Sequence, residues 1–165
     1  MNDTPKKNFP RPRPLFAAVF IAALALDQLV KQLVVRTMSL GESRAVIPGF
    51  FNLTYVRNDG IAFGFLQGNN FLMGLIALVI LGAGLWWARQ LDWKKTEVNL
   101  LAALIISGAV GNLIDRWSVG HVIDFLDFHW KTRWAWPAFN VADACISMSI
   151  TYLFFRLLWP RHKKE

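Results

Sequence analysis

Four long runs of apolar residues dominate the chain, and each is close to the length that a helix needs to cross a bilayer. They cover residues 15–35, 71–88, 98–114 and 138–158, and about 20 residues of helix span the hydrocarbon. Pro137 stands where the fourth helix is expected to begin. The pattern predicts an α-helical membrane protein with four transmembrane helices in a single domain.

The segment between the first two runs, residues 36–70, has a different pattern. It is too long for a bare connection. Apolar and polar positions alternate from Phe50 to Tyr55, as in a half-buried strand, and turn residues flank this stretch at Pro48-Gly49 and Asn58-Asp59-Gly60. We expect a β-rich insertion at the membrane surface, followed by an interfacial segment at residues 63–66.

Composition supports the membrane location. The chain is 55% hydrophobic and carries a formal net charge of +7, and a soluble domain of this size has too little polar surface to cover that much apolar material. Its Lys and Arg residues lie between the apolar runs and not in a continuous patch among aromatic residues, which argues against nucleic-acid binding. The single cysteine, Cys145, excludes an intrachain disulfide and is interpreted as a packing residue.

The positions of the cations predict the orientation, because cytoplasmic flanks retain Lys and Arg. Eleven of them flank the ends that include both termini, six lie in the two longer loops, and Lys31 is inside the first run. Tryptophans, which favour membrane interfaces, fall at the same boundaries, and none lies in the middle of a run. We therefore expect both termini in the cytoplasm and the β-rich insertion on the outer side of the membrane.

The basic head and Ala23-Leu24-Ala25 are also typical of a cleavable secretory signal. Three further apolar runs follow, however, and the first run continues past the alanines to Val35. A retained first helix is the simpler interpretation.

Ionisable groups inside apolar runs are costly in hydrocarbon, so each needs a partner or a function. Asp27 and Lys31 are one helical turn apart, with the acid first, which is the favourable order for an ion pair. A structural pair that neutralises itself and a role in substrate binding both remain open.

A second polar set lies on the third predicted helix and directly after its apolar run. Gly108, Asn112 and Arg116 follow at four-residue steps and so form one stripe, with Asp115 beside Asn112 on the adjoining face. Small, polar and cationic residues in this order are typical of a helix that packs closely against a neighbour at the small residue and forms hydrogen bonds at the polar residues nearer its end. Structural bracing and catalysis explain the stripe equally well.

Two carboxylates are candidates for acid–base chemistry. Asn140 and Asp143 share one face at the start of the fourth helix, and Asp124 precedes them in a predicted loop that must fold back across Pro137. Paired carboxylates cannot both ionise easily, so one can take a proton from water while the other donates to a scissile carbonyl. Spacing alone leaves alternatives open: helix capping, a solvated loop residue, and Asp127 in place of Asp124.

Metal chemistry has less support. His121, Asp124 and His129 could be drawn as ligands, but the chain has no His-Glu-x-x-His motif and no paired cysteines. We expect neither a metal nor a cofactor.

Five strings, in order along nearly the whole chain, resemble the lipoprotein signal peptidases, also called signal peptidase II. The strings are Asp27-Gln28-Leu29-Val30-Lys31, Asn58-Asp59-Gly60-Ile61-Ala62-Phe63, Gly108-Ala109-Val110-Gly111-Asn112-Leu113-Ile114-Asp115-Arg116, Val122-Ile123-Asp124-Phe125 and Phe139-Asn140-Val141-Ala142-Asp143. The chain departs from the family pattern at Ile61, where a small residue is common.

The resemblance implies an aspartic endopeptidase of the bacterial inner membrane that acts at the periplasmic face. It would cleave diacylglyceryl-modified prolipoproteins just before the lipidated cysteine, work among membrane lipids as a monomer, and be inhibited by globomycin. Asp124 and Asp143 become the catalytic pair. The supporting site comprises Asn58, Gly108, Asn112, Arg116 and Asn140, and Asp27 and Lys31 also match family positions. A small polytopic transporter or a lipid-binding scaffold is the alternative function.

Overall fold

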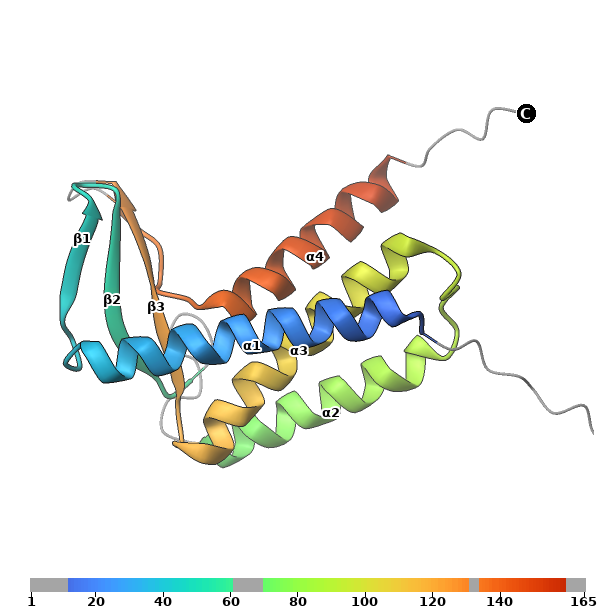
Figure 1. Cartoon of the computed structure of the whole chain (residues 1–165), viewed down its shortest axis with the longest axis horizontal. Coiled ribbons are helices and arrows are strands. Elements are labelled where there is room, and N and C mark those ends of the chain that lie inside the picture. The colour runs from blue at the N-terminus through green and yellow to red at the C-terminus, as the bar shows by residue number, and fades with distance from the viewer. Residues whose placement is uncertain (1–11, 61–69, 131–133, 160–165) are drawn as a thin grey trace, which may run out of the picture.

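The computed structural model describes residues 12–60, 70–130 and 134–159 and shows helices joined to a small sheet (Figure 1). The predicted interfacial segment at 63–66 and Ile61 lie outside these ranges. The elements, in chain order, are α1 (Pro14–Thr37), β1 (Ser43–Ile47), β2 (Phe51–Asn58), α2 (Asn70–Ala88), α3 (Thr96–Ser118), β3 (Val122–Trp130), β4 (Trp134–Ala135) and α4 (Val141–Leu158).

The helices run alternately up and down, and the sheet lies at one end of them (Figure 1). The start of α1 and the end of α4 lie at the other end, together with the connection between α2 and α3. Helix α3 contacts each of the other three helices. By length and composition, α1 and α3 are long and apolar enough to cross a membrane, whereas the apolar part of α2, Gly74–Trp86, is shorter. The structure thus has the four predicted helices within the described ranges, but four spans remain a prediction.

The boundaries of the helices follow from local chemistry. Helix α1 begins at a proline, Pro14, which is favoured in the first turn. Helix α4 begins with a capping box, in which Asn140 Oδ1 accepts a hydrogen bond of 2.9 Å from the backbone N–H of Asp143, and Asp143 Oδ2 accepts one of 3.3 Å from the backbone N–H of Asn140. The cap starts α4 at Val141, so the predicted start at residue 138, directly after Pro137, is wrong.

The sheet is antiparallel, with the strand order β1-β2-β3-β4. The prediction that the 36–70 insertion forms the sheet is only half right, because β3 and β4 come from the segment between α3 and α4. Asp124 therefore lies on a strand, paired with Val56 of β2, and not in a loop. This pairing carries Asp124 to the start of α4, since Leu126 also forms a bridge with Phe139.

A small hydrophobic core joins the sheet to the end of α1. It consists of Val34, Met38, Tyr55, Ile123 and Phe125. In β2, residues 51–54 are all half-buried and Tyr55 is buried, so the predicted alternation does not extend along the strand; the hydroxyl of Thr54, next to Tyr55, donates to Asp127 Oδ2 at 2.8 Å. The core therefore packs β2 and β3 against the end of α1.

Two glycines let α1 and α4 approach α3 closely. A Cβ at Gly108 would lie 2.4 Å from the carbonyl oxygen of Ala142 in α4, and one at Gly111 would lie 2.7 Å from Oδ2 of Asp27 in α1. Both separations are shorter than real Cβ contacts. The polar faces of the three helices are therefore brought together where the sheet begins.

Candidate active site

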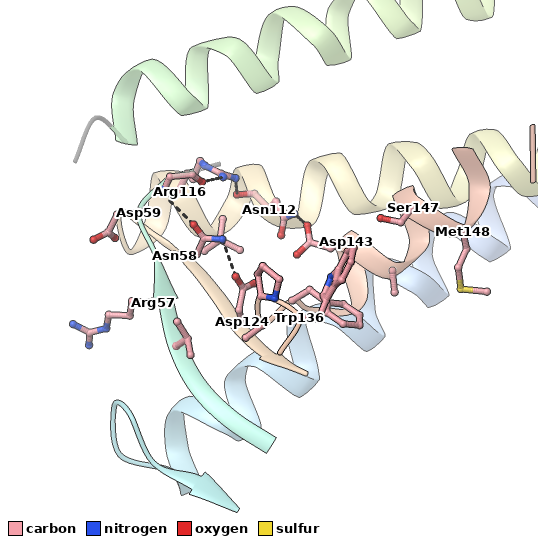
Figure 2. Close-up of a pocket in the computed structure, with 17 residues that line it drawn as sticks. Arg57, Asn58, Asp59, Asn112, Arg116, Asp124, Trp136, Asp143, Ser147 and Met148 are labelled. Carbon is pink, nitrogen blue, oxygen red and sulfur yellow. Dashed lines mark hydrogen bonds between the residues drawn. The ribbon is translucent and has the colours of Figure 1, made fainter. Parts of the chain in front are cut away.

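An open cavity of about 960 Å³ lies where β2, β3, α3 and the start of α4 meet (Figure 2). Five of the site residues predicted from the sequence line it: Asn58, Asn112, Arg116, Asp124 and Asp143. They come from four different elements, so the fold assembles the site from distant parts of the chain.

Asp124 is almost fully buried, at 1% exposure. Asn58 Nδ2 donates to its Oδ2 at 2.8 Å, and Asn140 Nδ2 donates to its Oδ1 at 2.7 Å. Burial, followed by the negative charge of Asp143, raises the pKa of Asp124 to about 7, while the amides of Asn58 and Asn140 and the more distant ammonium of Lys31 act in the opposite direction. Asp124 can therefore hold a proton near neutral pH.

Asp143 points into the same cavity from the first turn of α4 (Figure 2). Asn112 Nδ2 donates to its Oδ1 at 2.7 Å, and the backbone N–H of Asn140 donates to its Oδ2. Asn140 thus contacts both carboxylates, one through its side-chain amide and the other through its backbone N–H. One residue connects the strand carboxylate to the helix carboxylate.

The orientation of the Asn112 amide is set by its neighbours. Its Oδ1 accepts hydrogen bonds from Lys31 Nζ at 3.0 Å and from Asn140 Nδ2 at 3.1 Å. With two donors on the oxygen, the Nδ2 group is the one directed at Asp143. The amide supplies a donor to a buried carboxylate, which favours the ionised form of that carboxylate.

Lys31 itself lies between two carboxylates. Its Nζ is 2.8 Å from Oδ2 of Asp27 and 2.8 Å from Oδ2 of Asp115, and all three side chains are at most 3% exposed. The sequence indicated the pairing of Asp27 with Lys31 but gave no partner to Asp115. The sequence does mark Asp115 as unusual, because it is a carboxylate next to the polar stripe of α3. Its contact with Lys31, 84 positions away, cannot be deduced from spacing.

Arg116 connects α3 to the turn after β2. Its Nη1 donates to the carbonyl oxygen of Asn112 and its Nη2 to that of Gly60, both at 3.3 Å. Its Nε is buried and has no hydrogen-bond partner within the described residues. The guanidinium lines the cavity on the side of Asn58 (Figure 2).

Two further candidates from the sequence, Gly108 and Asp127, also lie away from the cavity. Gly108 acts through the close approach of α3 to α4 described above. Asp127 is three residues beyond Asp124 on β3, so the two side chains point to opposite faces of the strand, and its Oδ2 accepts a hydrogen bond from Thr54. The alternation of the strand therefore places Asp124 at the cavity and directs Asp127 to the other face.

The arrangement suits acid–base chemistry. Within residues 12–60, 70–130 and 134–159, no three His, Cys, Asp or Glu side chains form a group that could hold a metal ion. His129 lies 3.9 Å from Oδ1 of Asp127 and not in the cavity. A pair of buried carboxylates, one with a raised pKa, can share a proton and act as base and acid on one peptide bond.

Comparisons with known proteins identify the family of the chain. Residues 19–159 match the family model described as signal peptidase (SPase) II. A lipoprotein signal peptidase of Geobacter sulfurreducens is 43% identical over 91% of this chain and 95% of its own, and one of Pseudomonas aeruginosa is 37% identical over 82% of both chains.

Two solved bacterial membrane enzymes share the fold. Each is 30% identical to this chain. The first covers 91% of both chains with a TM-score of 0.80, and the second covers 88% of this chain and 93% of its own with a TM-score of 0.76.

Proposed function

Because the chain belongs to the signal peptidase II family, we propose that it is an aspartic endopeptidase whose catalytic pair is Asp124 and Asp143. The chain is a membrane enzyme that removes signal peptides from prolipoproteins, the activity of this family. One observation carries the catalytic assignment: both carboxylates line a single cavity and are joined there by Asn140.

In the proposed mechanism the pair shares one proton at neutral pH. Asp124, with a pKa of about 7, holds that proton and donates it to the scissile carbonyl oxygen, while ionised Asp143 takes a proton from the attacking water. The amide of Asn112 stabilises the charge on Asp143 until it accepts the proton. No metal is needed to generate the nucleophile.

The shape of the cavity supports a lipid-bearing substrate. It extends along α4 to Ser147 and Met148, and Met148 is 71% exposed on the outside of the helix. At the sheet side, Trp136 is 50% exposed and stands over the same cavity. We propose that the acyl chains of a diacylglyceryl-cysteine stay in the lipid beside α4 while the peptide bond before that cysteine reaches the two aspartates.

The same proposal includes four spans in a bacterial inner membrane, with both termini in the cytoplasm and the site at the periplasmic face. The up-and-down order of the helices supports it, since both described chain ends lie opposite the sheet (Figure 1). A transporter or a lipid-binding scaffold is not favoured, because the relatives reported above are peptidases.

A cleavage assay tests the proposal. The purified protein, incubated with a lipobox peptide that carries a diacylglyceryl cysteine, should release the fragment that ends just before that cysteine. The same peptide without the lipid should be a poor substrate, and equal turnover of the two peptides would contradict the role given to the membrane. Normal cleavage by Asp143→Asn would contradict the catalytic assignment.

A further inference from the structure

The buried ion cluster of Asp27, Lys31 and Asp115 touches the backbone beside each of the two aspartates. Asp115 Oδ2 accepts a hydrogen bond of 3.2 Å from the backbone N–H of Ile123, which precedes Asp124. Asp27 Oδ1 accepts one of 2.9 Å from the backbone N–H of Ala142, which precedes Asp143. Each carboxylate of the cluster therefore holds the residue directly before one member of the pair.

Lys31 joins these two contacts and adds a third. It binds Oδ2 of both carboxylates at 2.8 Å, and its remaining contact is with Oδ1 of Asn112. Gln28 closes the cluster on the other side, because its Nε2 donates to Asp27 Oδ2 at 3.2 Å and to Asp115 Oδ1 at 3.1 Å. A movement of any charged member would be transmitted to β3, to α4 or to the amide that serves Asp143.

We propose that Asp27, Lys31 and Asp115 form a positioning cluster that sets the separation of Asp124 and Asp143 in the reaction. The inference rests on the proposed function. None of the three side chains lines the cavity, so they act through Ile123, Ala142 and Asn112 and not on the substrate.

Burial argues for a role beyond stability. Asp27 and Lys31 are each 1% exposed and Asp115 is 2% exposed. The desolvation of such ions offsets much of their attraction, and apolar residues of similar volume often stabilise a fold at least as well. What apolar residues cannot supply is an acceptor for the N–H groups of Ile123 and Ala142.

Gly111 offers a way to displace the cluster without changing any charge. A Cβ at this position would lie 2.7 Å from Asp27 Oδ2, the oxygen that binds Lys31, so the carboxylate of Asp27 must shift. Alanine favours a helix over glycine by about 1 kcal/mol, so Gly111→Ala does not weaken α3 itself. Gly84→Ala in α2 is the matched control, because its Cβ meets nothing within 4 Å.

The experiment measures kcat, KM and the pH dependence of lipidated-peptide cleavage for the full-length wild type and both variants. We expect Gly111→Ala to lower kcat by roughly 10- to 100-fold, as small misplacements of reacting groups do, with KM within about threefold. Gly84→Ala should match the wild type.

The pH profile separates positioning from loss of folded protein. The charged groups that act on Asp124 are Asp143 of α4, Lys31 of α1 and Arg116 of α3, and all three remain in Gly111→Ala. If the two carboxylates move apart, the repulsion from Asp143 that helps to raise the pKa of Asp124 weakens, so the alkaline limb of the profile shifts to lower pH. A smaller fraction of folded enzyme would lower the rate equally at every pH and leave the alkaline limb of the profile at the same pH.

An unchanged kcat, or a lower kcat with an unshifted limb, would overturn the inference. If Gly111→Ala does not accumulate in the membrane, Asp115→Asn takes its place. The single oxygen of an amide cannot accept hydrogen bonds from Ile123, Lys31 and Gln28 together, as the carboxylate of Asp115 does. The matched control is Asp92→Asn, the same substitution at an exposed position. Failure of both variants to fold would make the cluster structural and would also overturn it. Activity of Asp124→Asn, in contrast, would overturn the proposed function.

Discussion

The side-chain amide of Asn140 donates a hydrogen bond of 2.7 Å to the carboxylate of Asp124, although the two residues are 16 positions apart and lie in a helix cap and a strand. The same side chain caps α4 through its oxygen. One asparagine thus begins a helix and orients a carboxylate, and the two tasks use different atoms. Substitutions can separate them.

Asn140→Ser should keep the helix cap and lose the contact with Asp124. Serine is as good a capping residue as asparagine, but it has no amide donor. Loss of the hydrogen bond to Asp124 should lower the unfolding free energy, since a hydrogen bond to a charged group is worth about 1.5–3 kcal/mol, and it should also lower kcat by at least about tenfold.

Asn140→Ala serves as the comparison, because it removes both functions. Its unfolding free energy should fall below that of Asn140→Ser by about 1 kcal/mol, the usual cost of a lost cap, and its activity should be no higher than that of Asn140→Ser. Full activity in the serine variant would show that the amide of Asn140 has no part in the reaction.

The pKa of Asp124 predicts the alkaline limit of activity. Below about pH 7 Asp124 is protonated and can act as the acid; above it the proton is lost, so kcat should decline as pH rises through about 7. The contribution of Asp124 to stability has the same sign: between pH 3.8 and about 7 this carboxyl binds more protons in the folded protein than in the unfolded chain, so its contribution to the free energy of unfolding should decrease as pH rises through that window.

Asn58→Ala should move this limit upward. The amide of Asn58 donates to Asp124 Oδ2 and favours the ionised form, so its removal raises the pKa of Asp124 still further. The rate at pH 7 should fall through the lost contact, while the alkaline limb of the normalised profile shifts to higher pH. A shift in the other direction would contradict the assignment of Asp124 as the acid.

Gly108→Ala should destabilise the contact between α3 and α4. The new methyl group would lie 2.4 Å from the carbonyl oxygen of Ala142 and 2.8 Å from Ile146 Cγ1, so the helices must separate, and we expect a loss of roughly 1–3 kcal/mol of stability as in other overpacked cores. Thermal unfolding in one detergent measures it. Gly82→Ala, whose Cβ meets nothing within 4 Å, should be neutral or stabilising.

The sequence was sufficient for the helices and insufficient for β3. The four apolar runs are long enough to stand out above any local signal. Strand β3 was missed because residues 122–125 are buried on both faces, so the alternation of apolar and polar positions that revealed β2 is absent. The sequence therefore predicts that Asp124 lies in a loop between two helices, whereas it lies on β3.

Pairwise contacts across helices were also beyond the sequence. The spacing of Asp27 and Lys31 predicts their pairing within α1, but it contains no information on Asp115 of α3 or on the N–H groups of Ile123 and Ala142. Likewise, Pro137 suggested a helix start, whereas the side chain of Asn140 decides where α4 begins. The polar network depends on which helices pack together, and the periodicity of a single helix contains no information about its neighbours.

The most direct test of the catalytic pair compares Asp124→Asn with Asp127→Asn, two identical substitutions on opposite faces of β3. Purified and matched for folded protein, each is assayed for cleavage of the diacylglyceryl lipobox peptide. Asp124→Asn should be inactive, with kcat reduced by at least about 10³-fold through loss of the acid–base pair, and Asp127→Asn should retain most of the wild-type rate. Normal cleavage by Asp124→Asn, or equal losses in the two variants, would contradict the assignment of Asp124 and Asp143 as the residues that perform the chemistry.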